Sequence, residues 1–488
     1  MAGFHVENFG CRAARADGEA VSARLRSEGF SERILPEADV VVINTCSVTA
    51  EADRDARAFL RKTIRLNPQA RVVMTGCYAQ RAPEELAALE GVSAVVGNSH
   101  KGLVPRIVRA LAANGGMHSS SASPALVSLG DLQPAPLKAQ IWADDRFAHS
   151  FIEEAQVVPG MQTRPNLKIQ EGCGNRCTFC VIPTTRGASR SLSAAKVLAQ
   201  VRGFISVGGK ELVLSGINLG RWGRDLEESQ SLAGLVRQIL TETSLPRLRL
   251  SSIEPMDWTP ELVGLLQEFG GGRLARHTHL PLQSGSDSVL RRMHRRYRPW
   301  HYQQKVAALL DAAGPGLAIG ADVMVGFPGE TEAEFRETYE FIAGLPFAYL
   351  HLFPFSPRPG TRGWELHREN PVAPQAVSER MTALRTLADE KSRSFRAGFA
   401  GCSLPAITLQ TPAQIAALGR TSALTDNYLP VEMTALLPAN HLLDVWMTGI
   451  SEAGTLLGVP DLGESDNRFA CRDSDSCISP YSLQENDT

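Results

Sequence analysis

The chain has 488 residues, 43% of them hydrophobic and 21% charged, which is typical of a soluble globular protein with a buried core. Fifty Lys and Arg against 52 Asp and Glu give a formal charge of −2, which excludes a generally basic nucleic-acid coat and an acidic disordered chain but not a local basic patch. At roughly 100–200 residues per domain, about three domains are expected. No apolar run reaches the ~18–20 residues that span a bilayer, and the start lacks a signal-peptide pattern. We therefore expect a cytoplasmic protein without a membrane partner, where disulfides rarely persist.

The nine cysteines of the chain then need an explanation other than disulfide bonding. They fall into two groups of three and three outliers: Cys11, Cys46 and Cys77; Cys173, Cys177 and Cys180; and Cys402, Cys471 and Cys477.

Each cysteine of the first group follows an apolar or β-branched run, namely FHVENFG, ADVVVINT and RVVMTG. Helix-like segments at Asp17–Ser27, Ala50–Arg65 and Pro83–Leu89 alternate with these runs, and Val92–Val96 adds a further strand. The alternation predicts βα units with a parallel sheet in residues 1–115. Ligands gather at the carboxyl ends of such strands, so the three cysteines could converge there. The alternative is that they are buried structural thiols.

Residues 116–160 lack sustained periodicity and are expected to form a linker with some ordered pieces. From Asn166 the β/α rhythm resumes and predicts an incomplete barrel of six parallel strands within residues 161–399, with its chemistry at the strand carboxyl ends. The predicted strands are Leu167–Gln170, Leu212–Ile217, Leu248–Ile253, Thr278–Gln283, Ala321–Phe327 and Tyr349–Phe355. The predicted helices are Ala194–Ile205, Leu232–Thr243, Pro260–Phe269, Tyr302–Ala313 and Glu332–Ala343, with Gln375–Phe399 closing the barrel.

The remaining chain changes to short strands separated by turns. Pro405–Gln410, Leu429–Thr434 and Leu443–Met447 predict a small β-barrel in residues 400–460. Residues 461–488 form a polar tail. The fold class is therefore α/β, with a parallel-sheet domain, a partial (β/α)6 barrel and a small C-terminal β-barrel.

Cys173, Cys177 and Cys180 form C-x3-C-x2-C in EGCGNRCTFCVIP, just after the first barrel strand. Three thiolates from one loop can bind three irons of a cubane cluster and leave the fourth iron open to a small molecule. A closed structural zinc site needs a fourth ligand, and no Cys or His follows at a suitable spacing.

This loop after the first strand of a βα barrel resembles the radical S-adenosylmethionine (SAM) superfamily. FGCRAARADGEA, NTCSVTAEADRDAR, TGCYAQ, SSIEP, LPLQSGSDSVLRRM, DVMVGFPGET and FPFSPRPGTR narrow the resemblance to the methylthiotransferase family. The resemblance implies SAM and two 4Fe–4S clusters as cofactors, one cluster on Cys173, Cys177 and Cys180 and an auxiliary one on Cys11, Cys46 and Cys77. It also implies that the C-terminal barrel is a TRAM-like RNA-binding domain.

The reaction implied by this family replaces a C–H hydrogen with a methylthio group, with SAM as both methyl donor and radical source. The segment NTCSVTAEADRDARAFLRK most resembles the branch that acts on carbon 2 of N6-threonylcarbamoyladenosine beside the tRNA anticodon. The other branches act on tRNA isopentenyladenosine or on an aspartate of a ribosomal protein. A non-catalytic RNA-binding iron–sulfur protein and an electron carrier are the rivals from other classes. The expected partners are tRNA and an electron-donor protein such as a flavodoxin or ferredoxin, with the enzyme a monomer.

Polar residues at the barrel strand ends are candidates for holding SAM. Ordinary loop hydrogen bonding is the alternative role for each of them. The polar candidates are Glu211, Ser252, Gln283, Ser284 and Asp322, with Glu254 as a further position. Phe179 and Val181, with Ile182, are expected to pack on the adenine of SAM, and Gly326 and Gly329 to permit close backbone approach or tight turns. Glu211 is the weakest, because Lys210 interrupts the glycine–glutamate pattern that it resembles.

The stretch RRMHRRYR carries five arginines in eight residues, and Arg suits phosphate contacts and stacking on bases. The alternative is a solvated helix face that supports the barrel. The RNA-binding candidates are Arg291, Arg292, Arg295, Arg296 and Arg298, with Arg358 and Arg362 as further phosphate contacts. Lys101, Arg106 and Arg109 are expected to form an exposed helix face.

One departure from the family pattern follows the first cysteine, where Cys11-Arg12-Ala13-Ala14 stands in place of Cys-Lys-x-Asn. Similarly, Asp17-Gly18-Glu19 stands in place of an acidic-Ser-Glu group. The missing asparagine puts a contact around the auxiliary cluster in doubt but leaves the ligand itself in place. Cys402, Cys471 and Cys477 are expected to be incidental.

Overall fold

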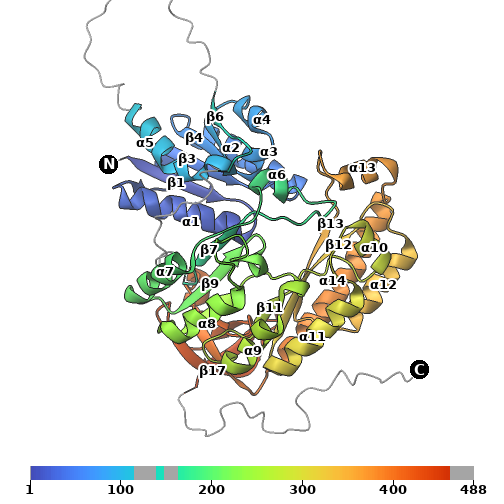
Figure 1. The fold of residues 1–488 in the computed structure, drawn as a ribbon. Helices are drawn as coiled ribbons and strands as arrows, with labels where there is room; N and C mark the ends of the chain where they lie inside the picture. Colours follow the sequence, from blue (N-terminus) through green and yellow to red (C-terminus); the bar gives the residue numbers. More distant parts are fainter. Residues whose placement is uncertain (1, 115–138, 148–162, 462–488) are drawn as a thin grey trace, which may run out of the picture. The chain divides into compact units, whose positions relative to one another are not determined.

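The computed structural model describes residues 2–114, 139–147 and 163–461, which fall into two compact units (Figure 1). Unit 1 comprises the described part of Met1–Val157 together with Glu171–Arg190 and Ser356–Thr361. Unit 2 comprises the described part of Val158–Gln170, Ser191–Phe355 and the described residues from Arg362 onward. The loop with Cys173, Cys177 and Cys180 therefore belongs to unit 1.

Unit 1 is built on a six-stranded parallel sheet in the order β2-β1-β3-β4-β5-β6. The strands are β1 Gly3–Asn8, β2 Ser31–Glu32, β3 Val40–Thr45, β4 Arg71–Gly76, β5 Val92–Gly97 and β6 Gln140–Trp142. All six residues of the central strand β3 are buried. Such an apolar run requires helices on both faces of the sheet. The edge strand β6 lies within the predicted linker and is one of its ordered pieces.

Two apolar clusters cover the two faces of this sheet. Helices α1 (Arg12–Ser27) and α5 (Val104–Asn114) contribute Val21, Leu25 and Val108 to one cluster. Helices α2, α3 and α4 contribute Leu60, Tyr78 and Leu86 to the other. Their bounds are α2 Ala50–Leu66, α3 Cys77–Arg81 and α4 Pro83–Ala87, with the short 3-10 helices η1 Leu35–Glu37 and η2 Asn98–Leu103. Helix α1 begins five residues before the predicted Asp17, because Cys11 is its N-cap.

Unit 2 contains the parallel strands of the predicted partial barrel. One sheet has the order β10-β9-β7-β8 and the other β11-β12-β13, and bridges Leu248↔Leu274 and Ser252↔His279 connect them. The bounds are β7 Asn166–Glu171, β8 Arg190–Ser191, β9 Glu211–Gly216, β10 Arg247–Leu250, β11 His277–His279, β12 Ala318–Val325 and β13 Tyr349–Pro354. Strand β11 stops before the predicted end at Gln283, because Pro281 lacks a backbone donor and Gln283 has φ +66°.

Helices follow these strands, as the periodicity predicts. Their bounds are α6 Ile182–Arg186 (in unit 1), α7 Ala194–Ser206, α8 Leu232–Glu242, α9 Pro260–Phe269, α10 Asp287–Arg292, α11 Pro299–Ala313, α12 Glu332–Ala343, α13 Arg362–Glu369 and α14 Pro374–Ala397, with the 3-10 helices η5 Leu219–Arg221 and η6 Pro255–Asp257. No helix in the described ranges is both long and apolar enough to cross a membrane.

The C-terminal strands form a closed barrel in the order β14-β15-β16-β18-β17. The bounds are β14 Ser403–Thr408, β15 Thr421–Thr425, β16 Pro430–Met433, β17 Leu442–Ile450 and β18 Leu456–Pro460, with helix α15 at Ala413–Ala416. The predicted α/β fold class is confirmed. Strands β15 and β18 were missed, because Thr, Ser and Gly interrupt their short apolar runs.

Candidate functional site

Three neighbouring strands of unit 1 deliver the first cysteine group to one edge of the sheet. Cys11 follows β1 and caps α1, Cys46 directly follows β3, and Cys77 is the first residue of α3 after β4. Gly10 has φ +102°, and a Cβ atom there would lie 2.6 Å from the Sγ of Cys46. The backbone beside Cys11 therefore lies directly against Cys46, as the βα pattern predicts.

The Cys46 thiol at this edge is a poor acid on its own. Burial raises the pKa of Cys46 to about 12, and the neighbouring Cys77 and Cys11 add to the rise. Cys46 and Cys77 are 4% and 2% exposed, whereas Cys11 is exposed. Thiolates crowded in this way require a compensating cation, and a cluster of iron ions with thiolate ligands supplies one. The donor set therefore fits the auxiliary cluster that the family implies.

Arg186 connects this edge with the second cysteine loop, both of which belong to unit 1. Its Nε lies 3.2 Å from the Sγ of Cys77, and its Nη1 lies 2.6 Å from Glu171 and 3.2 Å from Asp17. Asn98 also directs its Nδ2 to Cys77 Sγ at 3.4 Å and donates to the carbonyl of Thr185 at 2.8 Å. Although burial alone would lower it, the pKa of Arg186 is raised well above its usual value by Cys77, Glu171 and Asp17. A permanent positive charge therefore lies beside a predicted cluster ligand.

Lys101 corrects one sequence prediction. It was expected on an exposed helix face with Arg106 and Arg109, but it is 1% exposed and pairs with the buried carboxylate of Asp17. Arg106 and Arg109 are exposed as predicted. Lys101 shares Asp17 with Arg186, so two buried cations are compensated by Asp17 and Glu171.

The turn that carries Cys46 is braced by a second set of ion pairs in unit 1. Asp53 accepts from Arg81 at 2.9 Å and from Arg358 at 2.7 Å, and Arg81 also donates to the Oγ of Ser47. Arg358 is 4% exposed, which contradicts its prediction as a contact to substrate phosphate. Arg362, the other such candidate, is an exposed residue that pairs with Glu365.

The second cysteine group lies in the loop between β7 and α6. Backbone N–H groups of Asn175 and Ile182 point to the sulfurs of Cys173 and Cys180, each at 3.4 Å. Cys173, Cys177 and Cys180 are all partly exposed. Three accessible thiols, two of which receive backbone N–H donors at their sulfurs, fit a cluster that must also receive a small-molecule ligand.

At Ala14, where the sequence departs from the family pattern, two asparagines lie beside helix α1. Asn44 donates to the carbonyl of Ala14 and to the Oδ1 of Asn8. A Cβ atom at Gly18 would lie 1.7 Å from that same Oδ1. Asn8 therefore fills the space beside α1 that Gly18 leaves open.

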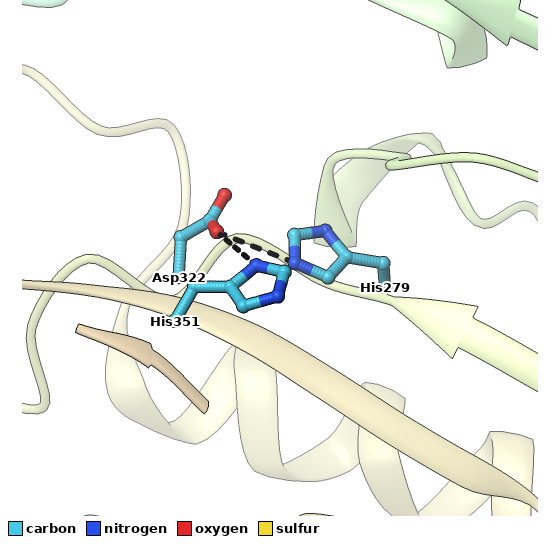
Figure 2. A group of neighbouring side chains, drawn as sticks. All are labelled: His279, Asp322 and His351. Carbon is cyan, nitrogen blue, oxygen red and sulfur yellow. Dashed lines mark hydrogen bonds and ion pairs between the residues drawn. The ribbon is translucent and has the colours of Figure 1, made fainter. Parts of the chain in front are cut away.

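In unit 2, Asp322 lies between two imidazoles contributed by neighbouring strands (Figure 2). Its Oδ1 is 3.3 Å from the Nε2 of His279 and 3.3 Å from the Nδ1 of His351. Burial alone would raise the pKa of Asp322, but the adjacent His279 and His351 imidazoles hold it well below its usual value. The three ligand atoms lie within 4.8 Å of one another, so the group could also hold a cation. Its ionised carboxylate can accept hydrogen bonds from a ligand's hydroxyl groups.

Two of the other SAM candidates lie beside Asp322. The N–H of Gln283 donates to the carbonyl of Asp322 at 2.7 Å, and its buried Oε1 has no hydrogen-bond partner among the described residues. The Oγ of Ser252 lies 3.0 Å from the Nδ1 of His279. Ser284, in contrast, is fully buried and bonds to Thr338 and to the N–H of Ser286, so it holds the turn together. The structure therefore brings Ser252, Gln283 and Asp322 together.

Glu211 has a different role from the one predicted. It is fully buried and accepts from Arg249 at 2.8 Å, Arg247 at 3.4 Å and Arg164 at 3.5 Å. Burial alone would raise its pKa, but these guanidinium groups lower it to about 2. Both oxygens are committed to arginines, so the proposed SAM contact at Glu211 is withdrawn.

The remaining candidates lie near the second cysteine loop or in turns. Phe179 is partly exposed and Val181 is buried, both in unit 1. Gly326 and Gly329 have φ +75° and +73°, so both need the conformational freedom of glycine. Glu254 pairs with Arg295.

The arginines of Arg291–Arg298 lie beside carboxylates outside the stretch, and two of these carboxylates, Asp287 and Asp257, are each shared by two arginines. Each of the five arginines of the stretch lies within 4 Å of a carboxylate of the chain: Arg291 and Arg298 of Asp287, Arg292 of Glu334, Arg295 of Glu254, and Arg296 of Asp257. Arg295 is also 7% exposed, so an RNA contact by this residue is contradicted. For the other four, the pairing favours the alternative of a helix face that supports the barrel.

The C-terminal barrel is short of positive charge. Residues 403–460 contain Arg420 and no lysine, against Asp426, Glu432, Asp444 and Glu452. Arg420 pairs with Glu432. Phosphate binding depends on clustered cations, so this composition does not favour RNA binding by the barrel itself. Cys402 is partly exposed and lies just before β14; Cys471 and Cys477 lie outside the described residues.

Sequence reasoning missed Arg186, Asn98 and Asp53 as residues that hold the cysteines in place. The only local signal for Arg186 was its position six residues after Cys180. Contacts between residues about 90 and 110 positions apart along the chain leave no such signal at all.

Two segments of the chain match models of known protein families. Residues 3–97 match the model of "Uncharacterized protein family UPF0004", and residues 167–342 match that of the radical SAM superfamily. The chain is 34% identical to the threonylcarbamoyladenosine tRNA methylthiotransferase MtaB of Bacillus subtilis (strain 168), over 88% of this chain and 90% of that protein. It is 34% identical to the MtaB of Aquifex aeolicus (strain VF5), over 90% of this chain and 98% of that protein.

A relative from another branch is nearly as similar. The tRNA-2-methylthio-N(6)-dimethylallyladenosine synthase of Geobacter metallireducens (strain ATCC 53774 / DSM 7210 / GS-15) is 32% identical, over 81% of this chain and 85% of that protein. Among solved structures, the radical SAM methyltransferase TsrM of Kitasatospora setae has a TM-score of 0.54 at 14% identity, covering 76% of this chain and 78% of that one. That likeness concerns the fold alone. The chain belongs to the family of radical SAM methylthiotransferases, iron–sulfur enzymes that use SAM.

Proposed function

We propose that this enzyme methylthiolates carbon 2 of N6-threonylcarbamoyladenosine beside the anticodon of tRNA. The observation that carries the proposal is the pair of cysteine groups in unit 1, connected through Arg186. A radical enzyme with a single cluster needs only Cys173, Cys177 and Cys180. The second group at the ends of β1, β3 and β4 supports a second cluster, which a sulfur-inserting reaction requires.

A reduced iron–sulfur cluster with bound SAM supplies the radical chemistry that an unactivated C–H bond needs. The chain's own residues hold and orient the reactants. Cys173, Cys177 and Cys180 are the proposed ligands of the cluster that binds SAM, and Cys11, Cys46 and Cys77 those of the auxiliary cluster. Arg186 and Asn98 direct N–H groups to the sulfur of Cys77 and so offset negative charge there.

The proposed SAM contacts are Asp322, Gln283 and Ser252 in unit 2, and Phe179 and Val181 beside the cluster loop. Asp322 is held ionised by His279 and His351 and can accept from ligand hydroxyls. Gln283 offers a buried carbonyl oxygen without a partner among the described residues. A buried polar atom without a partner is costly unless a ligand satisfies it.

The choice of branch is supported by the names of the most similar relatives, which include MtaB proteins from Bacillus subtilis and Aquifex aeolicus. The Geobacter relative makes tRNA dimethylallyladenosine the second candidate substrate. We further propose that the enzyme acts in the cytoplasm as a monomer and takes electrons from a flavodoxin or ferredoxin.

The test is mass spectrometry of tRNA nucleosides from a strain without this gene. Methylthiolated threonylcarbamoyladenosine should disappear while its unmethylthiolated precursor accumulates, and the chain supplied on a plasmid should restore it. Methylthiolated isopentenyladenosine serves as the internal control and should stay unchanged. Loss of methylthiolated isopentenyladenosine alone would instead assign the enzyme to the branch that acts on isopentenyladenosine.

A further inference from the structure

Helix α2 of unit 1 carries a row of cations along one side. Arg54, Arg57, Arg61 and Arg65 are spaced by three, four and four residues, which places them on one face of an α-helix. Lys62 lies beside this row. We call these five residues the α2 basic stripe.

The stripe faces solvent because the opposite side of α2 is anchored. Ala56, Leu60 and Thr63 are buried against the sheet. Arg54, Arg61, Lys62 and Arg65 are exposed. None of these four forms an ion pair within the described residues, whereas Arg57 pairs with Glu85.

Ordinary helix stability does not account for this arrangement. Like charges four residues apart, such as Arg57 with Arg61 and Arg61 with Arg65, destabilise a helix. The helix dipole favours a cation in the last turn, which explains Arg65 but not Arg54 or Arg61. The exposed acids of α2, Glu51 and Asp55, form no ion pair with the stripe. A polyanionic ligand would relieve the repulsion.

Every arginine of the two surfaces expected to bind RNA lies within 4 Å of a carboxylate. The arginines of Arg291–Arg298 lie beside carboxylates of the chain, and residues 403–460 contain a single arginine, which is paired. On α2, by contrast, four exposed cations without an ion pair among the described residues lie within residues 54–65.

We propose that the α2 basic stripe binds the phosphate backbone of the tRNA substrate next to the base that is modified. Helix α2 begins four residues after Cys46, so its first turns lie close to the proposed auxiliary cluster. From Arg54 to Arg65 the stripe runs for about 16 Å, long enough to follow several consecutive phosphates. Phosphate contacts carry no sequence information but fix the position of the nucleic acid. This inference rests on the proposed tRNA substrate.

The test compares two quadruple variants of the full holoenzyme. R54Q/R61Q/K62Q/R65Q removes the free charges of the stripe, and glutamine keeps helix propensity. R106Q/R202Q/R385Q/R393Q removes the same charge from exposed positions on other helices. Binding of an anticodon stem-loop with threonylcarbamoyladenosine is measured by filter retention over a range of salt concentrations. SAM cleavage without RNA and iron content show that each variant is intact.

The stripe variant should bind the stem-loop about tenfold or more weakly. Its slope of log K against log salt should fall in magnitude by about three, since each phosphate contact contributes about 0.7–0.9. The control variant should keep the wild-type slope. An unchanged slope in an intact stripe variant overturns the inference while the proposed function stands. If the wild-type enzyme neither binds nor modifies the stem-loop, the proposed function fails as well.

Discussion

The Nε of Arg186 lies 3.2 Å from the Sγ of Cys77, although the two residues are 109 positions apart in the chain. Arg186 ends helix α6, which follows the second cysteine loop, and Cys77 begins helix α3 at the end of β4. One buried guanidinium thus contacts a proposed auxiliary-cluster ligand from the segment that carries the other cysteine group.

Replacing Arg186 by methionine should strongly destabilise unit 1. The change removes the ion pair between Arg186 and Glu171 and one of the two N–H donors to Cys77, and breaking a buried pair costs about 3–5 kcal/mol. Urea unfolding and iron content measure the effect, and both should fall. R106M removes an exposed arginine of helix α5 in the same unit and should lose less than 1 kcal/mol. Equal stability of the two variants would contradict the role of Arg186.

The triple variant C11A/C46A/C77A should lose about four irons per chain, because it removes the proposed ligands of one 4Fe–4S cluster. Cleavage of SAM to 5′-deoxyadenosine should persist, since Cys173, Cys177 and Cys180 remain. Iron analysis measures the loss of the cluster, and chromatography of the reaction products measures the cleavage of SAM. Unchanged iron content would disprove the two-cluster assignment.

Gly10→Ala should remove the auxiliary cluster although it replaces none of the proposed ligands. The new Cβ would lie 2.6 Å from the Sγ of Cys46, in addition to the strain of φ +102°. Gly29→Ala is the matched control, since Gly29 has φ +86° but nothing within 4 Å of the added atom. It should cost only the backbone strain of about 1–2 kcal/mol and keep its iron. Similar iron loss in both variants would show that strain, not the contact with Cys46, is responsible.

Asp322→Asn should raise the Kd for SAM by about ten- to a hundredfold, the usual effect of losing hydrogen bonds to a charged group. Equilibrium dialysis with labelled SAM measures it, and D55N on the surface of α2 is the control. Because the pKa of Asp322 lies well below its usual range, wild-type affinity should not vary through this group between pH 6 and 8. A Kd that depends on added EDTA would instead assign His279, Asp322 and His351 to a cation.

Glu211 should make unit 2 sensitive to acid. Its folded-state pKa of about 2 lies below the ordinary value of 4.5, so its stabilisation is present above about pH 4.5 and is lost as the pH falls toward 2. The shift corresponds to about 3 kcal/mol. Urea unfolding of the apoprotein at pH 7 and pH 3 should show E211Q much less stable than wild type at pH 7. The difference between E211Q and wild type in the free energy of unfolding should be smaller at pH 3. An equal difference at both pH values would contradict the ionised Glu211 as its source.

Local sequence was sufficient to predict most helices and strands and to identify the proposed cluster ligands. The strand-then-cysteine pattern at Cys11, Cys46 and Cys77 predicted that they converge, since parallel strands share one carboxyl edge. The spacing of Cys173, Cys177 and Cys180 restricts them to one loop. Both inferences depend on neighbours along the chain or on the regular geometry of a parallel sheet.

Only the tertiary structure decided which charges are free and which are committed. Lys101, Arg295 and Arg358 are ordinary cations in the sequence, yet each is buried against a carboxylate 84, 41 or 305 positions away. Arg54, Arg61 and Arg65 are equally ordinary cations in the sequence, but they remain exposed. A charge near zero over the whole chain cannot distinguish these cases, because burial and pairing depend on which distant segments the fold brings together.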